Sequence, residues 1–140
     1  MQRFLASISL FILLVAYMPL RAQSVYPMNQ GDKVRSTAMI EMPKGYVSGI
    51  CVMYNDGEEI KASIFNEFGI SAIDFSYSLR KDKVKLLGVI KMLNKWYIRK
   101  MLKSDLRKLM HALQQGKTEY RNEKYKIDYK FSPIENDSEE

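Results

Sequence analysis

The chain has little of the chemistry on which most enzymes and metalloproteins depend. Its 140 residues include one cysteine, Cys51, and one histidine, His111. A single cysteine excludes an intrachain disulfide, and a single histidine excludes a histidine cluster of the kind that binds zinc. The sequence also contains no glycine-rich phosphate loop. We therefore expect no metal, no cofactor and no disulfide framework.

The sequence offers no persuasive pair of catalytic side chains. Cys51 and His111 would be the possible nucleophile and base. Cys51 lies inside an apolar run, however, so we expect a small buried side chain rather than a reactive thiol. Glu58 and Glu59 follow a turn signal, where carboxylates usually face solvent. These absences predict a protein that is not an enzyme.

Length and charge limit the remaining possibilities. A chain of this size forms one domain, large enough to fold without a metal or a disulfide. Lysine and arginine number 22 against 16 acidic residues, a formal net charge of +6. Such an excess is modest, so the positions of the charges matter more than their number. No basic sheet face interleaved with aromatic residues is evident, and we expect no nucleic-acid partner.

The first 22 residues have the pattern of a signal peptide. Arg3 supplies a positive start, residues 4–17 form an apolar stretch, and cleavage is expected between Ala22 and Gln23. The apolar stretch is shorter than the ~20 residues that a membrane-spanning helix needs. We expect an exported protein of the periplasm or cell envelope, with secretion from the cell as the alternative. No cysteine lies next to the cut, so lipid attachment there is not expected.

Beyond the cut, apolar and polar residues alternate until the period changes once. Residues 23–32 have no periodicity and are expected to be a lead-in. The run at 46–54 is apolar on both faces, which predicts a central strand covered on both sides. Gly49 within that run indicates a bulge, a bend or the close approach of another element. In all, the first part of the chain is expected to form strands near 33–42, 46–54, 59–64, 73–79 and 84–90.

Near residue 93 the period changes from two to nearly four. We expect a helix over about 93–115, with Asn94 as its N-cap and Gly116 just beyond its C-terminus. The apolar stripe of this helix consists of Ile98, Leu102, Leu106, Leu109 and Leu113.

Alternation returns after the helix. Residues 124–131 predict a half-buried strand whose outer lysines suit an edge position, and 118–120 predict a short strand before it. Residues 135–140 are acidic and are expected to be a disordered tail. Residues 33–134 therefore form one domain of the α+β class, mainly β. We expect a curved antiparallel meander sheet, an open sheet or half barrel, packed around one long helix.

Two sets of side chains near the helix are candidate binding residues. The aromatic residues Trp96 and Tyr97, with Met92 and Met101, can line a mouth for an apolar ligand, although core packing is the alternative. Basic residues recur at every fourth position and can face an anion or a lipid headgroup, although a solvated helix face is the alternative. This basic row consists of Lys91, Lys95, Arg99, Lys103 and Arg107, and His111 continues it.

Several short segments resemble small envelope proteins and lipoproteins of Bacteroides-type bacteria. They are Ser48-Gly49 in an apolar strand, 65–70, 74–77, Leu93-Asn94-Lys95 and 102–107. Such proteins look like relatives of the lipoprotein carrier fold of the Lol system, a curved open sheet around a helix with an apolar hollow. The resemblance implies binding of an acyl chain or a lipoprotein and assigns no site residue. Many such relatives begin at a lipidated cysteine, and its absence here favours a soluble form.

Two functions from different classes follow. The first is a non-enzymatic envelope protein that binds an apolar or amphipathic ligand, a lipid or an acylated protein, between sheet and helix, with Lys95 and Arg99 holding the headgroup. The second is an interaction or scaffolding module whose basic row docks on an acidic protein or a membrane surface. Salt separates them, because surface docking weakens steeply with ionic strength. A hydrolase would need an acid and a base that converge in a cleft.

Overall fold

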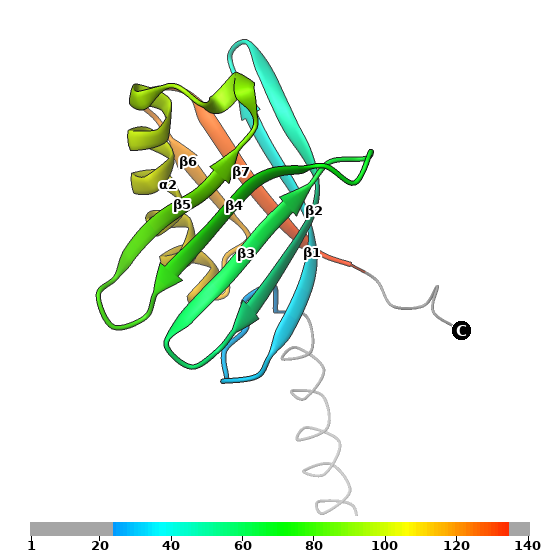
Figure 1. The fold of residues 1–140 in the computed structure, drawn as a ribbon, viewed down its shortest axis with the longest axis vertical. Helices are drawn as coiled ribbons and strands as arrows, with labels where there is room; N and C mark the ends of the chain where they lie inside the picture. Colours follow the sequence, from blue (N-terminus) through cyan, green and yellow to red (C-terminus); the bar gives the residue numbers. More distant parts are fainter. Residues whose placement is uncertain (1–23, 135–140) are drawn as a thin grey trace, which may run out of the picture.

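The computed structural model describes residues 24–134, which form a seven-stranded antiparallel sheet curled around one α-helix (Figure 1). Across the sheet the strands follow the order β5-β4-β3-β2-β1-β7-β6. The predicted α+β fold, mainly β with a half-barrel sheet, is confirmed. In chain order the elements are β1 (Lys33–Met42), β2 (Gly45–Asn55), β3 (Glu59–Phe65), β4 (Ser71–Ser78), β5 (Lys83–Val89), the 3₁₀ turn η2 (Lys91–Leu93), α2 (Trp96–Gln114), β6 (Glu119–Asn122) and β7 (Ile127–Pro133).

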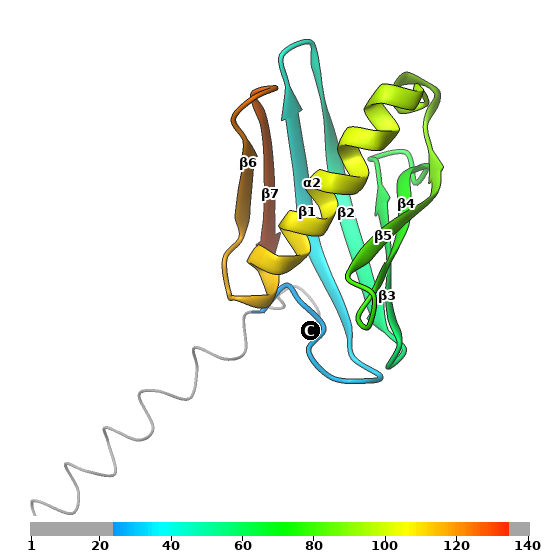
Figure 2. The ribbon, with the colours of Figure 1, turned by 90° about the vertical axis from the view of Figure 1, so that its left-hand side faces the viewer.

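The helix α2 lies across the concave face of the sheet (Figure 2). Its inward side chains belong to one buried cluster with the large residues of the strands, including Phe75 of β4 and Phe131 of β7. Side chains therefore fill the space between the helix and the middle of the sheet. Of the predicted stripe, Leu102, Leu106, Leu109 and Leu113 are fully buried and Ile98 is partly buried, so the stripe is confirmed.

The two ends of α2 differ in how well the sequence predicts them. Asn94 is not the N-cap: Lys95 takes that position without a side-chain cap. Asn94 instead ends the η2 turn, and its side-chain oxygen accepts a hydrogen bond from Arg99 (3.2 Å). This turn delays the start of the helix to Trp96.

The C-terminal end follows the prediction. Gly116 lies just past the helix in a left-handed conformation, with φ of 89°. Its N–H donates to the Leu113 carbonyl, and the N–H of Lys117 donates to the Ala112 carbonyl, both at 3.0 Å. This pair of bonds is a Schellman motif, which favours glycine because only glycine adopts that conformation without steric cost.

The strand β2 is central, but it is covered on one face only. It pairs with β1 and β3, and Val47, Cys51 and Met53 point into the core. On the other face Tyr46 and Tyr54 are exposed, since α2 covers only the concave side and no other element of residues 24–134 lies against the convex side. The prediction of a strand covered on both sides is wrong.

The end of the chain is also arranged differently from the prediction. The last strand begins at Ile127, and it lies inside the sheet between β1 and β6. Its outer lysines therefore do not mark an edge; the edge strands are β5 and β6. Tyr125 belongs to the β6–β7 turn and is half exposed, because Lys126 with φ of 56° breaks the expected alternation there.

The lead-in packs against the domain. Val25 and Tyr26 are buried, and the Asn55 side chain donates a hydrogen bond to the Pro27 carbonyl (2.9 Å). The backbone of Asn55 also bonds to Gly31 and Asp32. The expected signal peptide at 1–22 and the acidic tail at 135–140 lie outside the described residues.

At Gly49 two neighbouring strands approach closely. This is one of the three alternatives that the sequence predicted for this glycine. A Cβ atom placed on Gly49 would lie 1.7 Å from the carbonyl oxygen of Phe65, at the end of β3. Because that obstacle is backbone, no rotamer change relieves it. Gly45, in the same strand, has nothing within 4 Å of the corresponding position.

We predict that Gly49→Ala lowers the free energy of unfolding by about 1–3 kcal/mol, the usual cost of overpacking. Gly45→Ala is the matched control, and we expect little change there. Urea denaturation followed by circular dichroism measures both. Equal unfolding midpoints for the two variants would show that β3 moves away from Gly49 at no cost.

Candidate ligand groove at the start of the helix

A groove lies between the part of α2 from Trp96 to Lys108 and the β6–β7 turn. Its volume is about 500 Å³, within the range of small-molecule sites. We call it the helix groove. The side chains that line it are Trp96, Tyr97, Lys100, Met101, Ser104, Asp105 and Lys108 from α2 and Asn122, Lys124 and Tyr125 from β6 and the following turn.

Helical spacing brings the α2 side of the groove together. Lys100, Ser104 and Lys108 recur at every fourth residue, and Tyr97, Met101 and Asp105 form the neighbouring row. Residues four apart on a helix lie on the same face. These two rows face the β6–β7 hairpin, while the leucine stripe beside them faces the sheet.

The floor of the groove is a buried carboxylate. Asp105 is 2% exposed, and it accepts hydrogen bonds from the Asn122 amide (2.9 and 3.0 Å) and the Tyr129 hydroxyl (2.7 Å). Burial, with help from Asp105, raises the pKa of Tyr129, so this hydroxyl keeps its proton and remains a donor. The cluster fixes the helix against β6 and β7 and so fixes the width of the groove.

The walls of the groove combine aromatic surface with positive charge. Trp96 is 77% exposed, and its ring meets that of Tyr97 edge-on with centroids 5.8 Å apart. The Lys124 ammonium lies 5.3 Å from the centroid of the Tyr125 ring. Lys100 and Lys108 form no ion pair with any residue between 24 and 134. Aromatic faces beside free ammonium groups suit a ligand with an apolar part and an anionic part.

The structure brings together three of the four predicted apolar residues. Trp96, Tyr97 and Met101 line the helix groove, whereas Met92 lies before the helix, half exposed and outside the lining. Sequence reasoning missed the lysines of the groove and Tyr125. Lys100 lies four residues after Trp96, which was a usable signal; Lys124 and Tyr125 reach the site only through the fold.

The basic row does not line this groove. Lys91, Lys95 and Lys103 are exposed to solvent, and Arg99 donates to Asn94. Arg107 lies 3.0 Å from the Asp82 carboxylate at the β4–β5 turn. Arg107 is therefore engaged within the protein.

Asp82 organises a small polar cluster at that turn. Its carboxylate accepts hydrogen bonds from the Tyr77 hydroxyl (2.6 Å), from His111 and from Arg107. The Tyr77 and His111 hydrogen bonds, foremost among the causes, lower the pKa of Asp82 to about 2. The side chains of His111 and Arg107 come from α2, so the cluster ties the second half of the helix to the turn.

Cys51 and His111 do not form a catalytic pair. The His111 ring is bonded to Asp82, and Cys51 lies fully buried in β2. Burial raises the pKa of the Cys51 thiol to about 12, so the thiol stays protonated at neutral pH. Within residues 24–134 no group of three or more histidine, cysteine or acidic side chains is placed to hold a metal ion.

No family model, curated protein or solved structure matches this chain. The resemblance to envelope proteins and to the Lol carrier fold therefore stays a prediction. No helix in the described part of the chain is long and apolar enough to cross a membrane.

The Asp82 cluster predicts how stability depends on pH. The pKa of Asp82 falls from an ordinary 3.8 to about 2 on folding, so the ionised carboxylate stabilises the fold above pH 3.8. This contribution is lost as the pH falls from 3.8 towards 2. We expect Asp82→Asn to be less stable than the wild type near neutral pH, with the difference shrinking below pH 3.8.

Urea titrations between about pH 2 and 7 measure this difference. Glu41→Gln is the control, since Glu41 is exposed and accepts no side-chain hydrogen bond within the described residues. A difference between wild type and Asp82→Asn that stays constant down to pH 2 would mean that the cluster does not depend on the charge of Asp82.

Proposed function

We propose that this chain is an exported, non-enzymatic protein of the cell envelope that binds an anionic amphipathic molecule, a lipid or an acylated protein, in the helix groove. The observation that carries the proposal is the exposed aromatic surface of Trp96, Tyr97 and Tyr125 beside three lysines without ion-pair partners among residues 24–134.

The apolar part of the ligand would lie against the aromatic walls. An exposed tryptophan gives up little conformational freedom on binding and offers a large contact area. Each methylene of an acyl chain that leaves water contributes about 0.8 kcal/mol. Met101, partly buried at the foot of the groove, can adjust its shape to an irregular chain.

The headgroup would meet the lysines. Lys100 and Lys108 of α2 and Lys124 of the β6–β7 turn surround the groove, and each carries a point charge on a flexible stem. They replace Lys95 and Arg99, which the sequence favoured for this role.

The packed core supports a site at the margin of the fold. Leucine side chains of α2 and Phe131 of β7 fill the concave side of the sheet. A ligand bound between sheet and helix would therefore lie where α2 meets the β6–β7 hairpin. Export rests on the signal-peptide pattern of residues 1–22.

Binding of a dansyl-labelled fatty acid tests the proposal directly. Trp96 is the chain's single tryptophan, so energy transfer from Trp96 to the dansyl group reports occupancy of the helix groove. We expect Trp96→Ala to weaken binding at least tenfold and Met92→Ala, outside the groove, to change it little. Binding to both variants is measured by the emission of the directly excited dansyl group. Equal losses in both variants, or no energy transfer in the wild type, would contradict the proposal.

A second candidate is docking of the helix on an acidic surface. Lys91, Lys95 and Lys103 are exposed and have no ion-pair partner in the described part of the chain. Such a row attracts anionic lipid or protein, worth about 1 kcal/mol per charge near a membrane.

Salt and a charge reversal separate the two candidates. Docking on phosphatidylglycerol vesicles should weaken several-fold between 20 and 150 mM salt and should fall further in Lys95→Glu with Lys103→Glu. Fatty-acid binding in the helix groove should change by no more than about twofold in Lys95→Glu with Lys103→Glu, since neither residue lines the groove, and salt should weaken only its headgroup contribution. Vesicle binding that changes neither with salt nor in the Lys95→Glu, Lys103→Glu variant would rule out docking through the basic row.

A further inference from the structure

The strand β2 has an unpaired edge over its first five residues. It pairs with β1 from Gly45 to Tyr54, but its pairing with β3 begins only at Ile50. No strand among residues 24–134 lies beside 45–48 on the β3 side, and the end of β3 lies against Gly49. This stretch is an open edge next to the middle of the sheet, away from the edge strands β5 and β6.

The hydrogen-bond alternation shows which groups are free. Met42 and Gly45 flank the two-residue turn at 43–44, and they pair with each other in the β1–β2 ladder. In an antiparallel ladder alternate residues bond to the same neighbour, so Val47 and Gly49 also bond to β1. The backbone N–H and C=O groups of Tyr46 and Ser48 therefore point away from β1, towards the side where no strand pairs with them.

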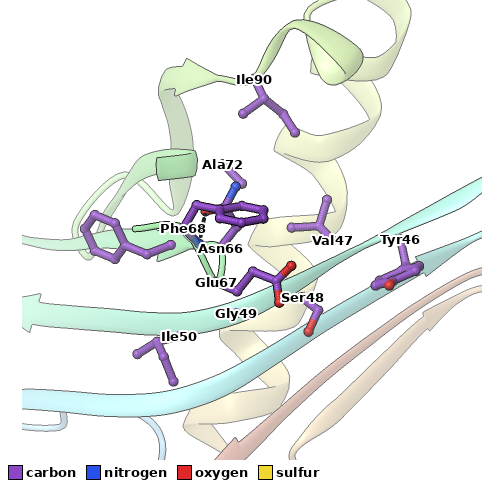
Figure 3. Close-up of a pocket in the computed structure, with 11 residues that line it drawn as sticks. Tyr46, Val47, Ser48, Gly49, Ile50, Asn66, Glu67, Phe68, Ala72 and Ile90 are labelled. Atoms are coloured by element: carbon purple, nitrogen blue, oxygen red, sulfur yellow. Dashed lines mark hydrogen bonds between the residues drawn. The ribbon is translucent and has the colours of Figure 1, made fainter. Parts of the chain in front are cut away.

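A groove of about 510 Å³ lies along this open edge (Figure 3). We call it the edge groove. The strand β2 forms one side and the β3–β4 loop forms the other. Tyr46 and Phe68 in its lining are exposed, at 67% and 77%. The half-buried Ile50 and Phe65 also line the groove. The groove thus offers apolar contacts beside unpaired backbone groups.

The loop that forms the far wall is held in shape. The Asn66 side-chain oxygen accepts hydrogen bonds from the N–H groups of Phe68 (2.9 Å) and Ile70 (3.0 Å). Gly69 adopts φ of 76°, which closes the turn. The wall therefore needs little rearrangement before a partner binds.

One charged side chain lines the edge groove. Glu67 projects from the loop towards β2 near Ser48 (Figure 3), and no ion pair joins it to any residue from 24 to 134. A partner that fits must therefore combine extended backbone, apolar side chains and a basic group.

We propose that the edge groove binds an extended segment of a partner protein, which adds a strand to β2 at Tyr46 and Ser48. Strand addition supplies main-chain hydrogen bonds for affinity and side-chain pockets for specificity. Apolar side chains at alternate positions of the segment lie between Tyr46 and Phe68, and a lysine or arginine lies opposite Glu67. The edge groove shares no residue with the helix groove, so this proposal is independent of the proposed function.

Charge favours a different protein over two other occupants. A second copy of the chain would bring its own edge, whose charged groove residue is again Glu67. Residues 135–140 of this chain carry four acidic side chains and would place like charges beside Glu67. A segment with a basic residue avoids both repulsions.

The test uses an array of acetylated hexapeptides in which valine, isoleucine, leucine or phenylalanine alternates with lysine, threonine or glutamate. We expect the purified protein to bind lysine-containing members at least tenfold tighter than their glutamate counterparts, and Glu67→Lys to reverse this order. Amide hydrogen exchange should slow at Tyr46 and Ser48 when such a peptide binds. Peptides with every amide N-methylated should not bind.

Two variants at one position separate backbone pairing from apolar contact. Ser48→Pro removes the outward N–H, a change tolerated at a strand edge, and should abolish peptide binding; Ser48→Thr keeps the N–H and should retain it. A circular dichroism spectrum of Ser48→Pro that matches the wild-type spectrum shows that the variant is folded.

Three results would overturn the proposal: no peptide binds, N-methylated peptides bind equally well, or amide protection falls outside residues 45–49. A dimer in sedimentation that Ser48→Pro dissociates would also overturn it, because a second copy would then occupy the edge.

Discussion

The rest of the molecule depends on the packing of one leucine stripe against the concave face of the sheet. Leu102, Leu106, Leu109 and Leu113 are fully buried there, and burying one such side chain contributes about 1.5–3 kcal/mol. A curled sheet without this helix would expose Phe75 and Phe131 to water. The same contact fills the concave surface that would otherwise form a hollow beneath the helix.

Two polar clusters orient the helix on that apolar contact. Asp105 bonds α2 to Asn122 of β6 and Tyr129 of β7, while Asp82 at the β4–β5 turn receives Arg107 and His111 from the second half of α2. The helix contacts both edge strands, β5 and β6. Apolar burial alone would let a helix slide or rotate, and the directional hydrogen bonds of the carboxylates remove that freedom.

Much of the fold is predictable because its pattern is local. Period two along the meander and period four along α2 depend only on which side chains face the core, and both are found in the structure. Predictions failed where a feature depends on contacts distant in sequence. The outer face of β2 looked fully buried because Ile50 and Val52 are apolar, but only the complete fold shows that both are half-buried and that no second layer among residues 24–134 covers that face.

The candidate site divides in the same way. Trp96, Tyr97 and Met101 share a helix face and were predicted from spacing, whereas Lys124 and Tyr125 reach the groove by a turn that the alternation did not reveal. The prediction for Met92 failed because Met92 lies in η2, before the helix begins at Trp96. Arg107 fits the basic row by spacing, but its partner Asp82 lies 25 residues away.

The position of β7 has a consequence for how the chain matures. Its partner β1 is the first strand in the sequence, and the two strands pair with Ser36 opposite Pro133. A chain still emerging from the ribosome can complete the meander from β1 to β5, but β1 then lacks its second neighbour until β7 has been synthesised. During that interval the nascent protein presents an open strand edge of the kind that recruits other chains.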